Sequence, residues 1–197
     1  YYFHWVEEQH GETACSALLG YQRALVKRNI PHMMIEEAHL NRLDDIKVLF
    51  MPRTIIVDDS VAEKLREFVE RGGTIVCESD CGSFDSAGIY RYPEDRFIWS
   101  MTGVADIGRR ALDADSITAE ISGKTMHLPV SQWLTPFPKA QNAEVWASNS
   151  DGVLLQRIPC DKGSVVLCGS YFGENYLSAE TPGKQSNAKY ADSFERF

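Results

Sequence analysis

The chain has 197 residues, of which 44% are hydrophobic and 24% are charged, and these proportions are those of an ordinary globular domain. They exclude a disordered or fibrous chain. The 20 basic residues against 28 acidic ones give a net charge of −8, whereas proteins that bind nucleic-acid phosphates concentrate Lys and Arg. Apolar runs such as residues 48–51 are far shorter than the roughly 20 residues that span a bilayer. We therefore expect a soluble chain with no nucleic-acid partner and no membrane partner.

The cysteine content indicates a reducing compartment. The number is odd, so the cysteines cannot all pair, and a chain of this size builds a core without a disulfide framework. We therefore expect a cytoplasmic protein. The five residues are Cys15, Cys77, Cys81, Cys160 and Cys168.

Helix and strand patterns alternate over the first 79 residues. Four apolar residues at helical spacing predict an amphipathic helix near residues 13–29: Ala14, Leu18, Tyr21 and Leu25. The apolar stripe of Val61, Leu65, Phe68 and Val69 predicts a second helix near 60–71, which Gly72 and Gly73 end. Short apolar runs predict strands at 32–35, 46–51 and 74–77. This rhythm predicts the open parallel sheet of an α/β fold.

Strand patterns dominate the second half. Alternating residues predict a hairpin between 117 and 128, turning at Ser122 and Gly123. Three further runs, at 143–147, 153–158 and 164–172, predict antiparallel strands that extend the sheet. We place one domain at 1–177 and a polar tail or linker at 178–197, with another element starting near Tyr190.

The predicted core combines the apolar positions of these elements. Its members are Leu18, Leu25, Val48, Phe50, Leu65, Phe68, Ile75, Val76, Val166 and Leu167.

The sequence contains no complete motif for binding a cofactor or a metal ion. The sequence has no Gly-x-Gly-x-x-Gly, and Pro182-Gly183-Lys184 lacks the other residues of a phosphate loop, so we expect no cofactor. The closest group of metal-ligand types is His4, His10 and Cys15, which a solvated helix entry explains better than a zinc site. We expect no metal site.

One turn could carry chemistry, because it follows a buried parallel strand at the edge where α/β sheets bind ligands. Ser79 or Cys81 could act there as a nucleophile, with Glu78 beside it. A nucleophile needs a histidine base within reach, yet the last histidine is His127, and Glu174 stands later without an imidazole. A structural turn is the better interpretation, and we assign no catalytic residue. Paired glycosidase carboxylates from distant positions cannot be recognised in one sequence.

Several segments together resemble the middle, non-catalytic trimerisation domain of glycoside hydrolase family 42 β-galactosidases. The resemblance covers residues 1–177. It is carried by residues 20–25 (GYQRAL), 29–31 (NIP), 48–53 (VLFMPR), 61–74 (VAEKLREFVERGGT), 163–166 (GSVV) and 169–173 (GSYFG).

The resemblance implies a flavodoxin-like, class I glutamine amidotransferase-like three-layer sandwich without amidotransferase catalysis. The nucleophile position of active relatives falls on Ser79, and their late His-x-Glu falls near Gly173 and Asn175. The catalytic glutamates belong to a preceding TIM barrel, and a chain that begins at Tyr1 is expected to be a piece of such a longer protein. The implied role is a scaffold in a homotrimer, with galactoside handled by the barrel. A stand-alone hydrolase using Ser79 or Cys81, or a small-molecule-binding flavodoxin-like module, is the alternative.

Aromatic and large apolar residues are dense between positions 84 and 99, without clean periodicity. They are Phe84, Ile89, Tyr90, Tyr92, Phe97, Ile98 and Trp99. Such a segment either covers the core or forms part of a subunit contact, where aromatic residues are enriched.

Overall fold

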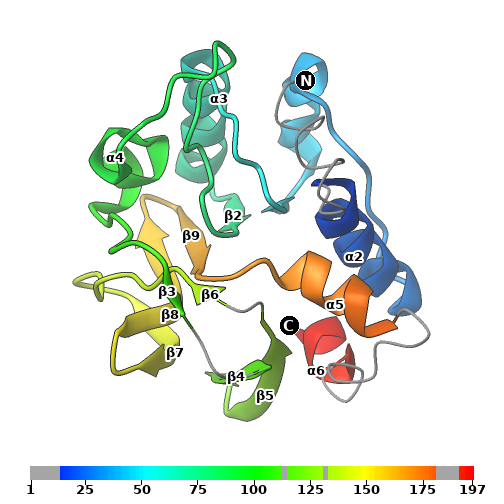
Figure 1. The fold of residues 1–197 in the computed structure, drawn as a ribbon. Helices are drawn as coiled ribbons and strands as arrows, with labels where there is room; N and C mark the ends of the chain where they lie inside the picture. The colour runs from blue at the N-terminus through cyan, green and yellow to red at the C-terminus, as the bar shows by residue number, and fades with distance from the viewer. Residues whose placement is uncertain (1–13, 112–114, 131–132, 181–190) are drawn as a thin grey trace.

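A five-stranded sheet crosses the centre of the molecule (Figure 1). The structure is a computed structural model and describes residues 14–111, 115–130, 133–180 and 191–197. In the spatial order β1-β2-β9-β8-β7, the strands β1, β2 and β9 are parallel, and β8 and β7 are antiparallel to their neighbours. Their bounds are β1 Val48–Met51, β2 Thr74–Cys77, β7 Glu144–Asn149, β8 Gly152–Cys160 and β9 Gly163–Cys168. The predicted mixed α/β sheet is confirmed, with β7 and β8 as its antiparallel extension, whereas β9, which was predicted among the antiparallel strands, runs parallel to β2.

Two layers cover the sheet, one on each face. On one side lie α3 (Asp59–Glu70), α4 (Phe97–Thr102) and the 3-10 helix η1 (Glu37–Asp45). On the other lie α2 (Ala14–Lys27), α5 (Phe172–Glu180), α6 (Ala191–Arg196) and the hairpin β4 (Ser116–Ile121) to β5 (Lys124–Pro129). The remaining short elements are η2 (Pro93–Asp95), β3 (Arg110–Ala111) and β6 (Trp133–Leu134).

The central strands contribute side chains to both cores. In β2, Ile75 packs with α3 while Val76 packs on the opposite face, and in β9 Val165 and Val166 divide in the same way. Successive side chains of a strand point to opposite faces, so a continuous apolar run is what a strand covered on both sides requires. This is why the two runs could be recognised in the sequence.

The predicted hairpin is confirmed in register and turn. Ile117 pairs with Leu128 and Ala119 with Met126. Ser122 and Gly123 have φ of 52° and 73°, and two left-handed residues in succession match the right-handed twist of the flanking strands.

The strand predicted at residues 32–35 is wrong. The structure places no strand there, and the side chains of Met33 and Met34 are 46% and 50% exposed. The chain here runs from the end of α2 up to η1 along the outside of the molecule (Figure 1). The apolar run therefore lies on the protein surface in an extended segment and does not form a strand of the core.

Six of the ten predicted core residues are buried, namely Leu65, Phe68, Ile75, Val76, Val166 and Leu167. Leu25 and Phe50 are half-buried. The prediction is wrong for Leu18 and Val48, which are 40% and 44% exposed, respectively.

The phase of α2 explains the error at Leu18. The face that turns inward carries Ala17, Tyr21 and Ala24. Small residues, Ala17 and Gly20, lie where α2 and α5 approach backbone to backbone: a Cβ added to Gly20 would lie 1.9 Å from the carbonyl oxygen of Gly173. Bulky leucines cannot occupy that contact, so Leu18 lies outside it.

The end of the chain contributes to the core. The predicted strand at 164–172 is too long, because β9 ends at Cys168 and α5 begins at Phe172. Helix α5 crosses the expected boundary at residue 177, and Phe194 of α6 is only 4% exposed. Residues 181–190, which make up half of the expected tail or linker, lie outside the described residues. None of the described helices has the length and apolar character that crossing a bilayer requires.

Candidate functional site

Polar side chains gather where the three parallel strands end. Arg53 follows β1, Glu78 and Asp80 follow β2, and Tyr171 follows β9. The carboxyl ends of parallel strands lie at one edge of the sheet, which is where α/β sheets bind ligands. This edge contains the turn that the sequence singled out, so it is the candidate site.

Glu78 is the buried centre of this edge, with 2% of its side chain exposed. Oε1 accepts hydrogen bonds from the Tyr21 hydroxyl at 3.0 Å and from the Gly173 backbone N–H at 2.9 Å. Oε2 accepts one from the Arg53 N–H at 2.9 Å. Burial raises the pKa of Glu78 to about 7, although these donors favour the charged form and lower it. The carboxyl thus ties α2, the end of β1 and α5 to the end of β2.

A chain of alternating charges lies beside Glu78. The Arg53 guanidinium pairs with the Glu174 carboxylate and lies 4.6 Å from the centroid of the Tyr171 ring. The Tyr171 hydroxyl donates to Asp80 Oδ2 at 2.5 Å, and Arg109 Nη2 donates to the same oxygen at 2.7 Å. Burial, followed by the Asp80 charge, raises the pKa of the Tyr171 phenol. Each charged group here has an opposite charge or a donor within contact distance.

A cavity of about 460 Å³ opens at this edge, a size that admits a small molecule. Charged and aromatic side chains share its lining: Arg53, Asp80, Phe84, Tyr90, Arg96, Asp106, Arg109 and Tyr171. Thr135 also lines it, and its hydroxyl oxygen is buried with no hydrogen-bond partner among the described residues. Guanidinium groups, carboxylates and rings can hold a small polar molecule, but such a lining does not by itself supply a nucleophile.

The two candidate nucleophiles are buried. Ser79 is 2% exposed, and within the described part of the chain its Oγ has no hydrogen-bond partner. Cys81 is 5% exposed and lies against the Cys77 thiol, whose pKa is raised first by burial and then by the contact with Cys81. A serine or cysteine nucleophile needs an adjacent base to take its proton. No residue in the described part of the chain hydrogen-bonds to Ser79 Oγ, so none of them is placed to act as its base.

The histidines of the described residues lie on other elements and contact other groups. His127 lies on β5, where Nδ1 is 3.3 Å from the Thr118 hydroxyl, and His32 Nδ1 contacts the Ile30 carbonyl oxygen. His39 lies in η1. The described residues contain no group of three His, Cys, Asp or Glu side chains that could hold a metal ion. Of the expected closest group, Cys15 is exposed on α2, and His4 and His10 lie outside the described residues.

Backbone packing leaves no room for a histidine side chain at Gly173, near which the late His-x-Glu of active amidotransferases falls. A Cβ added to Gly173 would lie 2.3 Å from the Ala17 carbonyl oxygen, far inside contact distance. Asn175, two residues on, donates from its side-chain amide to the Tyr171 carbonyl at 2.7 Å. The position where a base would stand is therefore occupied by the contact between α2 and α5.

The sequence located Glu78 and Glu174 but missed Arg53 and Tyr171. Arg53 follows a predicted parallel strand, so listing the residues after each such strand would have found it, whereas Tyr171 lay inside the predicted run 164–172, which is longer than β9. Tyr21 could not have been found in this way, because it lies on a helix 57 residues before its partner.

The profile of the β-galactosidase trimerisation domain family matches residues 5–181 of the sequence. The chain belongs to this family. Among solved structures, this trimerisation domain is similar to a catalytic mutant of the family 42 β-galactosidase Gan42B from G. stearothermophilus, with 21% identity, a TM-score of 0.66 and coverage of 82% of this chain and 24% of that one. The β-galactosidase of Bacillus circulans sp. alkalophilus gives 20% identity, a TM-score of 0.68 and coverage of 85% and 26%.

A shorter protein shares the fold as well. A cytoplasmic protein from Salmonella typhimurium LT2 is 15% identical, with a TM-score of 0.59 and coverage of 94% of this chain and 86% of that one. Comparison with curated proteins found no match. The trimerisation domain thus spans about a quarter of the length of the two β-galactosidases, 24% and 26%, and most of the length of the Salmonella protein. At these identities the structural likeness shows the fold.

Proposed function

We propose that this chain is the non-catalytic assembly domain of a larger β-galactosidase-type glycoside hydrolase and holds its subunits in a homotrimer. The observation that carries the proposal is the family match over residues 5–181. The galactoside would be cleaved by a barrel domain outside this chain. The coverage of about a quarter of each β-galactosidase supports a division of labour in which other segments carry the active site.

The state of the candidate site supports a role without chemistry of its own. Ser79 Oγ is buried and accepts or donates no hydrogen bond among the described residues, Gly173 leaves no room for a larger side chain, and Glu78 bonds to three elements of the fold. The two covering layers around a sheet with parallel strands also support the flavodoxin-like, class I glutamine amidotransferase-like sandwich that we propose as the finer fold assignment.

A cytoplasmic location without cofactor, nucleic-acid or membrane partner completes the proposal. Its support is the net charge of −8 and the five cysteines, all of which are unpaired thiols. Free buried thiols are typical of reducing compartments.

Light scattering on the purified chain tests the assembly role. We expect a mass approaching three times the 22.2 kDa of one chain as the concentration rises from about 5 to about 200 µM. A mass that stays at one chain over this range would overturn it.

Activity assays test the non-catalytic role. We expect the chain to hydrolyse neither glutamine nor chromogenic galactosides. Release of ammonia from glutamine that is abolished by Ser79→Ala or Cys81→Ala would replace the proposal with the stand-alone hydrolase.

A small-molecule-binding module is the second candidate, and the cavity of about 460 Å³ is the observation that favours it. Saturation-transfer NMR with galactose and with glutamine would test it. Binding that Arg109→Ala weakens would favour this candidate, with Lys124→Ala on the distant β4–β5 turn as the control.

A further inference from the structure

Most of the exposed large apolar side chains fall into two separate groups. The first, which we call the α2 surface, comprises Leu19, Val26, Ile30, Met33 and Met34, which are 46% to 56% exposed. Leu19 and Val26 are seven residues apart and so lie on one side of α2, and Ile30, Met33 and Met34 lie in the extended segment that follows the helix. Monomeric proteins rarely expose contiguous apolar patches unless these bind something.

The second group, which we call the aromatic surface, follows β2. Its members are Ile89, Tyr90, Tyr92, Trp99 and Ile107, exposed by 63%, 47%, 68%, 40% and 42%. Aromatic residues of this kind supply most of the energy at interface hot spots.

Buried contacts hold the aromatic surface in place. The Tyr90 ring meets the Phe84 ring edge-on at 5.4 Å and the Tyr92 ring at 5.5 Å. Arg96 donates to the Tyr90 hydroxyl at 3.1 Å and forms an ion pair with Asp106 at 2.6 Å, and both charged side chains are at most 10% exposed. A side chain fixed before binding loses little conformational entropy on association. The exposed rings are therefore preorganised for a contact.

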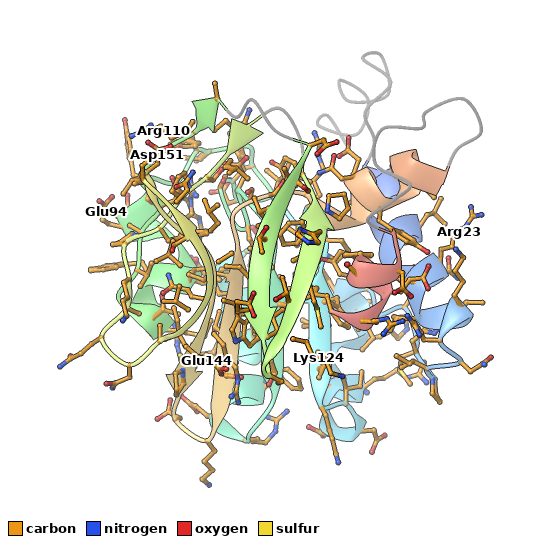
Figure 2. All side chains as sticks on the ribbon, turned by 90° about the horizontal axis from the view of Figure 1, so that it is seen from below. Arg23, Glu94, Arg110, Lys124, Glu144 and Asp151 are labelled. Carbon is orange, nitrogen blue, oxygen red and sulfur yellow. The ribbon has the colours of Figure 1, made fainter. Side chains whose placement is uncertain are left out.

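The two surfaces lie on opposite sides of the molecule and differ in charge. In Figure 1, α2 lies at the right and α4 at the left, and Figure 2 shows the labelled Arg23 and Glu94 at opposite ends. Helix α2 carries Arg23 and Lys27 and no acidic residue. The exposed Glu94 and Asp95 follow Tyr92. Lys27 is paired with Glu195 of α6, so the charges that differ between the two sides are the exposed Arg23 beside the α2 surface and the exposed Glu94 and Asp95 beside the aromatic surface.

A closed ring of three identical chains constrains its contacts. A contact in which a surface meets its own copy has two-fold symmetry and stops at a dimer. A three-membered ring needs two different surfaces on each chain, each facing the other kind on a neighbour. Two different exposed apolar surfaces on opposite sides of the chain fulfil this requirement.

We propose that the α2 surface of one copy packs against the aromatic surface of the next copy, and that three such contacts close the ring. This inference rests on the proposed assembly function. The rings of Tyr92 and Trp99 would insert among the aliphatic and methionine side chains, because methionine adapts its shape to a partner. Arg23 would face Glu94 across the rim.

Paired variants of the 197-residue chain test the inference. The first variant, Leu19→Glu with Val26→Glu, changes only the α2 surface. The second variant, Ile89→Asp with Tyr92→Asp, changes only the aromatic surface. A matched control, Gln141→Glu with Ser148→Asp, adds two negative charges at exposed positions elsewhere. We expect each of the first two variants to weaken association by about 100-fold or more and to remain monomeric, whereas the control assembles like the wild type.

Mixing the two interface variants gives the decisive measurement. Each retains one intact surface, so the mixture can form one complete contact between unlike chains but cannot close a ring. We expect the mass of two chains in the mixture and of one chain in either variant alone. Circular dichroism of each variant checks that the fold is retained.

The outcomes separate the inference from the function on which it rests. A wild-type mass of one chain at all concentrations overturns the assembly function. A trimeric wild type whose variants still assemble overturns only the inference. Dimers formed by a single variant alone also overturn it, because they would show that a surface pairs with its own copy.

Discussion

The carboxyl edge of the sheet and the aromatic surface use similar side chains in opposite ways. At the edge, Tyr171 donates to Asp80 and is 3% exposed, so its polar group is satisfied within the chain. On the aromatic surface, Tyr92 is 68% exposed although its ring is anchored by Tyr90. The first region joins elements of one chain, and the second presents rings to the outside.

This contrast shows that position in a fold does not determine function. The edge lies where α/β sheets bind ligands, yet its central carboxyl, Glu78, bonds to α2, β1 and α5. A family of assembly domains can retain the edge as a structural joint and place its interaction surface on a loop that leaves β2. The following predictions test both halves of that comparison.

The largest effect is expected where α2 and α5 meet behind Glu78. Gly173→Ala would place a Cβ 2.3 Å from the Ala17 carbonyl oxygen, and because the obstacle is backbone, the helices must separate. We expect a loss of about 4 kcal/mol of unfolding free energy, measured by urea denaturation. Gly88→Ala is the control: it has a φ of +79° but no atom near the new Cβ, so it should cost only about 1 kcal/mol. Equal losses would show that the close approach is not what matters.

The buried carboxyl should make stability depend on pH. The folded-state pKa of Glu78, about 7, lies above its ordinary value of 4.5, so the folded chain holds this proton more tightly. The stabilisation is fully present below pH 4.5 and is lost as the pH rises through 7, in total about 3 kcal/mol. Tyr21 and Arg53 lower the pKa and Glu174 raises it, so burial must dominate for this sign to hold.

Urea denaturation between pH 5 and 8 measures this effect. Glu78→Gln should remove the slope in that range, because the amide does not titrate. It should also cost about 1 to 3 kcal/mol at pH 5, since the amide N–H₂ would face a backbone donor at Arg53 or Gly173. An unchanged slope in Glu78→Gln would assign the pH dependence to other groups.

A matched pair of tyrosine variants compares the two regions directly. Tyr171→Phe removes the donor to Asp80 and leaves that carboxylate with Arg109, so we expect a loss of about 1.5 kcal/mol. Tyr92→Phe changes the same atom on an exposed ring, and its unfolding free energy should stay within about 0.5 kcal/mol of the wild type. A larger loss in Tyr92→Phe than in Tyr171→Phe would reverse the roles assigned to the two regions.

The sequence sufficed for elements whose patterns depend on local burial. The runs at 49–51 and 75–77 are apolar because layers cover both faces of the sheet, and the stripe of Leu65 and Phe68 on α3 faces the sheet. Sequence-based prediction failed where contacts between residues far apart in the chain determine the structure. The phase of α2 follows from Gly20 meeting Gly173, and the run at 32–35 is apolar without being buried, which no periodicity distinguishes from a short strand.

The same limit applies to the candidate site. The turn after β2 was predictable, because residues that follow a buried parallel strand lie at the ligand-binding edge. The partners of Glu78 were not: Tyr21 lies 57 residues before it and Gly173 lies 95 residues after it. Whether a carboxyl at that edge reacts or holds the fold together depends on these distant neighbours.

The smallest expected effect concerns the rim of the proposed contact. If Arg23 of one copy faces Glu94 of the next, Arg23→Glu alone and Glu94→Arg alone each place like charges opposite one another and should weaken association by about 5-fold. The double variant restores an opposite pair and should return to within about 2-fold of the wild type. Both single effects should shrink in about 0.5 M salt, because exposed charges are screened.

Lys124→Glu, at the start of β5, is the control: it changes the net charge as much as Arg23→Glu does and should leave association unchanged. If the loss of association in the double variant equals the sum of the two single losses, Arg23 and Glu94 do not meet, even if the apolar surfaces do.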